Sequence, residues 1–134
     1  LYFHDTRLLC HLLGSTPSDL ARANPARFGH IVENFVLSEL TKANTSSRET
    51  ADLSFYRTND GREVDFVLEQ NRKLVAIEVK GAENITEKDL SGIKEFQQVA
   101  GDDFHCGIIL CNTPRVIAYG KGIYLLPFNS LWED

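Results

Sequence analysis

Residues 63–80 read EVDFVLEQNRKLVAIEVK and give the clearest indication of the fold class. Apolar and charged side chains alternate along both halves of this stretch, which is the period of a β-strand. Asn71 and Arg72 separate the halves, so the sequence predicts two strands, residues 63–70 and 73–80, joined by a two-residue turn. One face of this hairpin is expected to be apolar and the other charged. The apolar face would carry Val64, Phe66, Leu68, Val75, Ile77 and Val79, and the charged face Glu63, Asp65, Glu78 and Lys80.

The two-residue turn sets the register of the hairpin. Gln70 then pairs with Lys73, and Asp65 falls directly opposite Glu78, with Cβ atoms about 5 Å apart. Two carboxylates at that distance repel each other unless a cation compensates. Mg²⁺ is commonly held by one or two carboxylates together with water and phosphate. The pattern therefore predicts a Mg²⁺ or Mn²⁺ site, with Lys80 two residues beyond Glu78 and within reach of an attacking water.

Simpler interpretations of the same residues stay open. A strand with alternating apolar and charged residues is usually just a half-exposed strand. Glu63 opposite Lys80 is more often a cross-strand ion pair than part of a catalytic site. Glu33 falls at the margin of the apolar side of a helix, where it could bend over the sheet edge toward the acids or remain solvated. Asn34 and Glu39 lie farther round that helix, where we expect solvent.

The remaining elements predict an α/β fold with a mixed sheet and helices against it. Periodicity and capping residues favour helices at residues 5–13, 26–43 and 86–100, and a turn-rich loop at residues 15–25. Further strands are expected at residues 53–58, 104–111, 115–119 and 122–126, followed by a short docked segment containing Leu131 and Trp132.

Composition bounds the class of protein. The chain has 134 residues, 43% hydrophobic and 25% charged, which suits one globular domain and excludes a disordered tail, a collagen-like rod or a disulfide scaffold. A net charge of −5 argues against a protein that holds nucleic acid by bulk positive charge. Three cysteines without metal-ligand spacing favour a reducing cytoplasm. No apolar run reaches the ~20 residues of a membrane span.

Two resemblances are carried by short motifs. Asp65, a gap of twelve residues and then Glu78-Val79-Lys80 resemble the PD-(D/E)XK phosphodiesterase motif, with Val64 where that motif has proline. The wider sequence resembles a C-terminal domain of unknown function found on bacterial and archaeal AAA-type ATPases. The matching stretches are YFHDTRLL at residues 2–9, VENFV at 32–36, FYRT at 55–58, EVDFV at 63–67 and IEVK at 77–80.

These resemblances imply a restriction-endonuclease-like mixed β-sheet flanked by α-helices. Residues 1–134 would be a single nuclease-like domain, the C-terminal fragment of a longer protein with an upstream ATPase and a winged-helix-like linker. ATP would bind only that upstream part. Glu33, Asp65 and Glu78, with the Val79 carbonyl, would hold Mg²⁺ or Mn²⁺, and Lys80 would orient the water.

Two functional hypotheses follow. The first is a metal-dependent nuclease domain of an AAA-type ATPase that cleaves DNA by a metal-activated water. The second is a catalytically inactive nuclease-fold module that binds nucleic acid or a protein partner and regulates the ATPase. The acidic balance predicts weak DNA binding by this chain alone, so most of the affinity would come from the ATPase and the linker.

Overall fold

The computed structural model describes residues 11–131 except 13, 15, 82 and 83. The chain divides into two compact units, residues 1–48 and 49–134, each described separately below. The helix expected at residues 5–13 falls almost entirely outside the described residues, as does Trp132.

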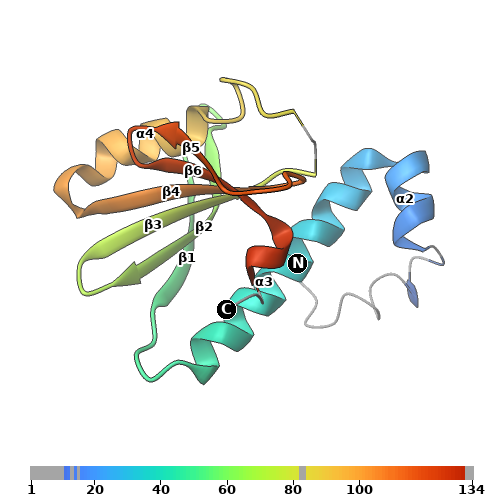
Figure 1. Ribbon diagram of the computed structural model, residues 1–134, viewed down its shortest axis with the longest axis horizontal. Coiled ribbons are helices and arrows are strands. Elements are labelled where there is room, and N and C mark those ends of the chain that lie inside the picture. Colours follow the sequence, from blue (N-terminus) through green and yellow to red (C-terminus); the bar gives the residue numbers. More distant parts are fainter. Residues whose placement is uncertain (1–10, 13, 15, 82–83, 132–134) are drawn as a thin grey trace. The chain divides into compact units, whose positions relative to one another are not determined.

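The described part of the first unit includes helices α2 (Pro17–Ala23) and α3 (Pro25–Ser46). Figure 1 shows them in blue and cyan. Helix α2 corrects the loop expected at residues 15–25. Thr16 caps the helix by accepting a hydrogen bond from the Asp19 N–H (3.2 Å), and Pro17 occupies the first helical position, where proline is well tolerated. Residues typical of turns are therefore also the residues that start this helix.

Helix α3 confirms the long helix predicted at residues 26–43 and continues for three more residues. Ile31 on this helix packs with Leu20 of α2. The expectation for Asn34 was wrong, since it is only 2% exposed. Glu39 lies at the surface in part and pairs with Lys42 (2.7 Å), one turn along the helix.

The second unit is a six-stranded mixed sheet in the order β1-β2-β3-β4-β6-β5. The strands are β1 (Asp52–Arg57), β2 (Glu63–Gln70), β3 (Lys73–Val79), β4 (Phe104–Cys111), β5 (Ile117–Gly120) and β6 (Ile123–Pro127). Strands β3, β4 and β6 run parallel, whereas β1, β2 and β3 form an antiparallel meander. The predicted mixed α/β fold is confirmed.

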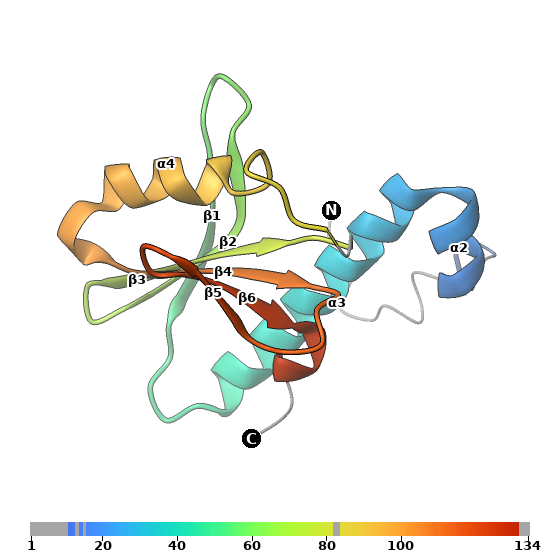
Figure 2. The same cartoon turned by 45° about the horizontal axis from the view of Figure 1, so that its top comes forward.

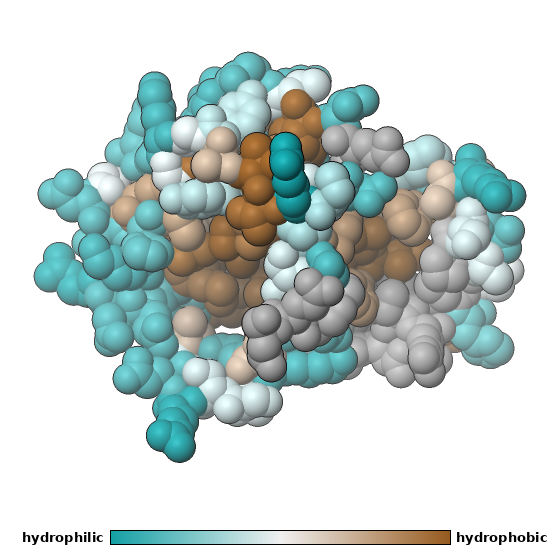
Figure 3. Space-filling model, in the orientation of Figure 1, coloured by the Kyte–Doolittle hydropathy of each residue, from teal (hydrophilic) through white to brown (hydrophobic). Residues whose placement is uncertain are grey.

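Helix α4 (Ser91–Ala100) packs against one face of this sheet, as Figure 2 shows. It begins five residues later than predicted, because Thr86 caps a separate turn that precedes it. The buried cluster beneath it contains Leu90, Ile93, Phe96, Val64, Val67, Ala76, Ile109, Cys111, Ile123 and Leu125. Figure 3 shows hydrophobic residues grouped over the strands of this unit and hydrophilic residues around its outer rim.

Gly92 permits the close approach of α4 to the start of β2. A Cβ atom added at this glycine would lie 2.1 Å from the Glu63 carbonyl oxygen, far inside any normal contact distance. The first turn of α4 is therefore held directly against the backbone of the strand that carries Asp65.

A β-bulge interrupts the pairing of β1 with β2. Ser54 lies opposite Val67, and Tyr56 lies opposite Val64, so β2 has one residue more than β1 between these two pairs. The bulge places Val64 and Val67 in the same cluster under α4, whereas strict alternation predicts opposite faces. The expected row of Val64 with Phe66 and Leu68 is therefore wrong at its first member.

The remaining sequence expectations concern thiols and membranes. Cys106 and Cys111 are free, and burial raises the pKa of both thiols, as expected of small buried hydrophobes. Cys10 lies outside the described residues. Within residues 11–131, apart from the four gaps, no helix combines the length and apolar character of a membrane span. A final 3₁₀ turn, η2 (Phe128–Leu131), follows β6.

Candidate metal-binding site

The open end of the β2–β3 hairpin brings Asp65 beside the backbone of β3. The regular ladder runs from Gln70 opposite Lys73 to Phe66 opposite Ile77, as the two-residue turn predicts. Beyond it, Asp65 Oδ2 accepts a hydrogen bond from the Val79 N–H (2.7 Å). The bulge at residues 65–66 explains this contact, because a bulge redirects the side chain of the strand that carries the extra residue.

Glu78 is a buried acid with an incomplete set of partners. Its side chain lies on the face that α4 covers, because Ala76, two residues earlier on the same face of β3, belongs to the cluster under that helix. Glu78 itself is 5% exposed. One oxygen, Oε1, lies 2.9 Å from Lys80 Nζ. The other, Oε2, is buried and has no hydrogen-bond partner among the described residues. Buried polar atoms are normally satisfied, so this oxygen requires an explanation.

Electrostatics reflect the same environment. Burial, followed by the neighbouring Asp65 charge, raises the pKa of Glu78 from its ordinary 4.5 to about 7, against the opposing effect of Lys80. Burial alone would lower the pKa of Lys80, but the Glu78 carboxylate together with the charges of Asp65 and Asp89 outweighs burial and raises it. Lys80 therefore carries its positive charge at neutral pH, next to a carboxyl group that is poised to titrate there.

The ion pair expected between Glu63 and Lys80 is not formed. Arg57, which pairs with Glu63 across β1 and β2, places its Nε 3.6 Å from Glu63 Oε2. Lys80 follows the last residue of β3 and contacts Glu78 instead. The expected pair does not form because β1 supplies Arg57 as a partner directly opposite Glu63. Lys80 in turn has Glu78 only two residues away along the chain.

Glu33 belongs to the other compact unit. There its Oε2 lies 3.5 Å from Nδ1 of His30, one helical turn earlier. Its role as a third ligand, like that of the Val79 carbonyl, stays a prediction. Among the residues that the structure describes, no group of three or more His, Cys, Asp or Glu side chains converges in a way that could hold a metal ion.

Asp65 and Glu78 nevertheless fit a hard divalent cation. Carboxylate oxygens are the ligands that Mg²⁺ prefers, and Mg²⁺ usually keeps several waters instead of filling its coordination sphere with protein atoms. A cation near Glu78 Oε2 would satisfy the buried oxygen and remove the repulsion from Asp65. Two carboxylates are enough for such a site.

Sequence reasoning missed one acid near this site. Asp89, in the turn before α4, accepts hydrogen bonds from the N–H (2.9 Å) and hydroxyl (2.7 Å) of Thr86. Its charge contributes to the raised pKa of Lys80, so it lies within electrostatic range of that ammonium. The Thr-x-x-Asp spacing signals the turn but gives no indication that it folds back toward Lys80.

Comparison with known proteins gives a family but no activity. Residues 28–131 match DUF4143, a domain family of unknown function, and the chain belongs to it. No curated protein matches. Among solved structures, the chain is similar to one in the half-complex from the tetradecameric assembly of Thermococcus gammatolerans McrB AAA+ hexamers with bound McrC. The TM-score is 0.45 at 12% identity, over 75% of this chain and 27% of that one, so this chain spans about a quarter of that chain's length.

Proposed function

For this member of a family of unknown function, we propose a metal-dependent phosphodiesterase that cleaves DNA as part of an AAA-type ATPase. The observation that carries the proposal is the buried Glu78 Oε2, which has no donor within the described residues and lies beside a second acid. Side-chain pairs that serve only stability are usually complete, whereas perturbed and incomplete ones are concentrated at functional sites. The PD-(D/E)XK spacing of the same residues supports this assignment.

Each residue has a distinct role in the proposed site. Asp65 and Glu78 hold the cation, with the Val79 carbonyl as a further ligand. The bound metal supplies Lewis-acid stabilisation of developing charge and lowers the pKa of water. The Val79 N–H fixes the carboxylate of Asp65, which keeps that ligand from rotating away. The Lys80 ammonium, held by Glu78, orients a water toward the phosphate.

The direct test measures the cation before it measures turnover. Mn²⁺ is titrated calorimetrically into the full-length protein without nucleotide, for the wild type, Asp65→Asn and Glu78→Gln. We expect binding in the wild type and its loss in both variants. Glu69→Gln is the matched control, because Glu69 lies on β2 four residues from Asp65 but is exposed near the turn. DNA nicking with Mn²⁺ should follow the same order.

Two results would overturn the proposal. One is Mn²⁺ binding that is equal in Asp65→Asn and Glu69→Gln, because the acids would then not form the site. The other is nicking that persists undiminished in Asp65→Asn, because the activity would then come from elsewhere. Loss of binding in all three variants would also count against a local site.

A second candidate function is an inactive nuclease-fold module that binds nucleic acid or a protein partner and regulates the ATPase. It is favoured by the Lys80–Glu78 ion pair, which already neutralises one acid, and by the absence of a third converging ligand within the described residues. Such a module requires no cation. Failure to bind Mn²⁺ with an intact fold would favour this function over the first.

A further inference from the structure

Four cations of the sheet unit form no salt bridge within the described residues: Lys73, Lys88, Arg115 and Lys121. Lys88 still lies within electrostatic range of Asp89, and Lys121 within range of Glu87. All four are exposed. The other described cations of this unit are paired, as Arg57 is with Glu63 and Arg62 with Glu95. Unpaired, solvated cations are the groups available to a phosphate backbone.

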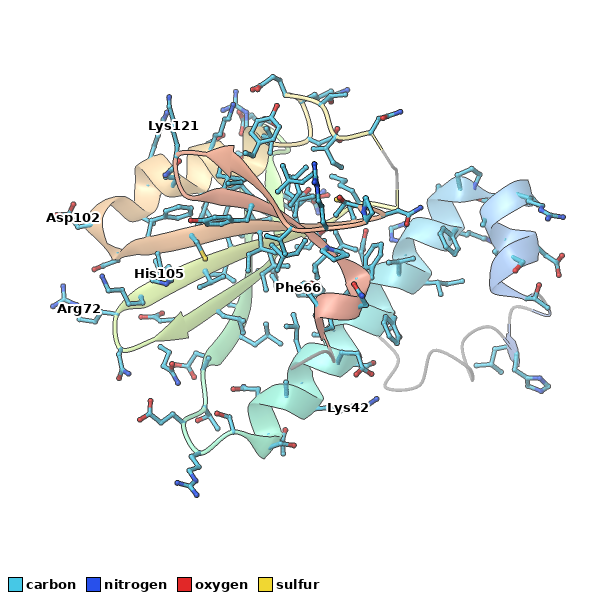
Figure 4. All side chains as sticks on the ribbon, in the orientation of Figure 1. Lys42, Phe66, Arg72, Asp102, His105 and Lys121 are labelled. Atoms are coloured by element: carbon cyan, nitrogen blue, oxygen red, sulfur yellow. The ribbon has the colours of Figure 1, made fainter. Side chains whose placement is uncertain are left out.

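By their positions in the chain, these four cations form two pairs. Lys73 is the first residue of β3 and Lys121 immediately precedes β6, so both lie where the parallel strands begin. Figure 4 labels Arg72, the neighbour of Lys73, and His105 of β4 on that side of the sheet unit. Lys88 and Arg115 belong to segments at the opposite end. Lys88 lies between the end of β3 and the start of α4, and Arg115 between the end of β4 and the start of β5.

Lys88 and Arg115 thus share an end of the sheet with Asp65, Glu78 and Lys80. The Lys80 N–H donates to the Leu110 carbonyl (2.9 Å), which shows that β3 and β4 finish side by side. Asp89, next to Lys88, contributes to the raised pKa of Lys80. In sheets with parallel strands, ligands bind outside the carboxyl ends of those strands. Both cations therefore stand at the end where a ligand of the acidic site would lie.

Both cations are also carried by ordered turns. The Lys88 carbonyl accepts hydrogen bonds from the N–H (3.2 Å) and hydroxyl (2.8 Å) of Ser91. The Arg115 carbonyl accepts a hydrogen bond from the Thr113 hydroxyl (3.0 Å). A fixed backbone lowers the conformational entropy lost when a side chain engages a ligand.

We infer that Lys88 and Arg115 form a phosphate-binding surface that positions the DNA backbone across the carboxyl ends of β3 and β4. The inference rests on the proposed function for its substrate and adds the residues that hold this substrate in register. Contacts of this kind carry no sequence information, so the surface fixes where the backbone lies and not which bases are read. It also reconciles a net charge of −5 with a DNA substrate, because two local cations at the correct end matter more than the sum.

The test compares cations at the two ends of the same sheet. Affinity of the full-length protein for a fluorescein-labelled DNA duplex is measured over a range of KCl concentrations, with Ca²⁺ in place of Mg²⁺ to suppress turnover. Lys88→Ala and Arg115→Ala should each weaken binding and reduce the slope of log K against log salt by about 0.9, and the double variant by about 1.8. Lys73→Ala is the matched control and should leave the slope unchanged.

The outcomes separate this inference from the proposed function. If Lys88→Ala and Arg115→Ala behave like Lys73→Ala, or if the wild type does not bind the duplex, the surface is wrong. Mn²⁺ binding at Asp65 and Glu78 is measured without DNA and is unaffected by that result. Conversely, a reduced salt slope with no Mn²⁺ binding would retain the surface and reject the phosphodiesterase.

Discussion

The two ends of the β2–β3 hairpin start from the same alternating sequence and differ in almost everything else. At the turn, Asn71 and Arg72 adopt positive φ angles of 50° and 61°, Gln70 pairs with Lys73, and the charged side chains are exposed. At the open end the ladder stops, a carboxylate takes the Val79 N–H, and Glu78 is buried. Alternation alone therefore does not distinguish an ordinary strand end from a candidate site; the backbone irregularity and the burial do.

The largest stability difference between the two ends should come from the titration of Glu78. With a folded pKa of about 7 against 4.5, the folded protein keeps a proton between these values that the unfolded chain has released. The contribution of Glu78 to stability is therefore largest below about pH 4.5, falls as the pH rises, and is lost above about pH 7, by about 3 kcal/mol in all. Urea unfolding with EDTA across this range measures the fall.

Glu78→Gln should flatten that pH dependence, whereas Glu69→Gln at the turn end should keep it. A slope in Glu78→Gln as steep as in the wild type would show that the buried acid is not its source.

Gly92 gives a smaller effect at the same open end. Gly92→Ala places a Cβ atom against the Glu63 carbonyl and forces α4 away from β2, which should cost about 2 kcal/mol of the free energy of unfolding. Chemical denaturation measures the loss. Gly29→Ala in helix α3, where an added Cβ meets nothing, should instead stabilise by about 0.5–1 kcal/mol. Equal effects of the two substitutions on the free energy of unfolding would contradict a close approach of α4 to β2 at Gly92.

The turn end gives the smallest effect, with the opposite sign. Arg72→Gly should stabilise the protein by about 0.5 kcal/mol, because glycine adopts a φ of 61° without the penalty that arginine incurs and Asn-Gly is the preferred two-residue turn. The long contact of Arg72 with Asp103 (4.0 Å) contributes little. Lys73→Gly, one residue later and inside strand β3, should destabilise the protein. Thermal unfolding of both variants measures the two effects, and a higher stability of Lys73→Gly than of Arg72→Gly would contradict this account.

The sequence predicts the local elements of this protein well. Three features depend on neighbouring residues and are confirmed: the hairpin turn at Asn71-Arg72, its register from Gln70 opposite Lys73 to Phe66 opposite Ile77, and the apolar strand β4. The predicted pairs beyond Phe66, Asp65 with Glu78 and Glu63 with Lys80, are not part of the ladder. Helix α2 was missed because threonine and proline mark turns and helix starts alike. The late start of α4 has the same origin, since Thr86 caps a turn and not the helix.

The candidate site was predictable in its residues but not in its environment. Spacing alone identified Asp65, Glu78 and Lys80, and the structure places all three at one end of the sheet. The burial of Glu78 was not predictable, because it depends on segments distant in sequence, among them α4. The bulge was also not predictable from the sequence, because an extra residue in β2 is defined only by its pairing with the neighbouring strand β1.

The bulge has a consequence for how this domain can change over generations. Asp65 is directed toward β3 by the number of residues between Val64 and Val67, and no particular neighbouring side chain is needed for this. Substitutions on β1 beside the bulge, such as at the exposed Ser54, should therefore be tolerated. Deletion of a single residue between Val64 and Val67 should be eliminated, because it would restore a regular ladder and turn the acid away. In this segment, selection would act on length before it acts on composition.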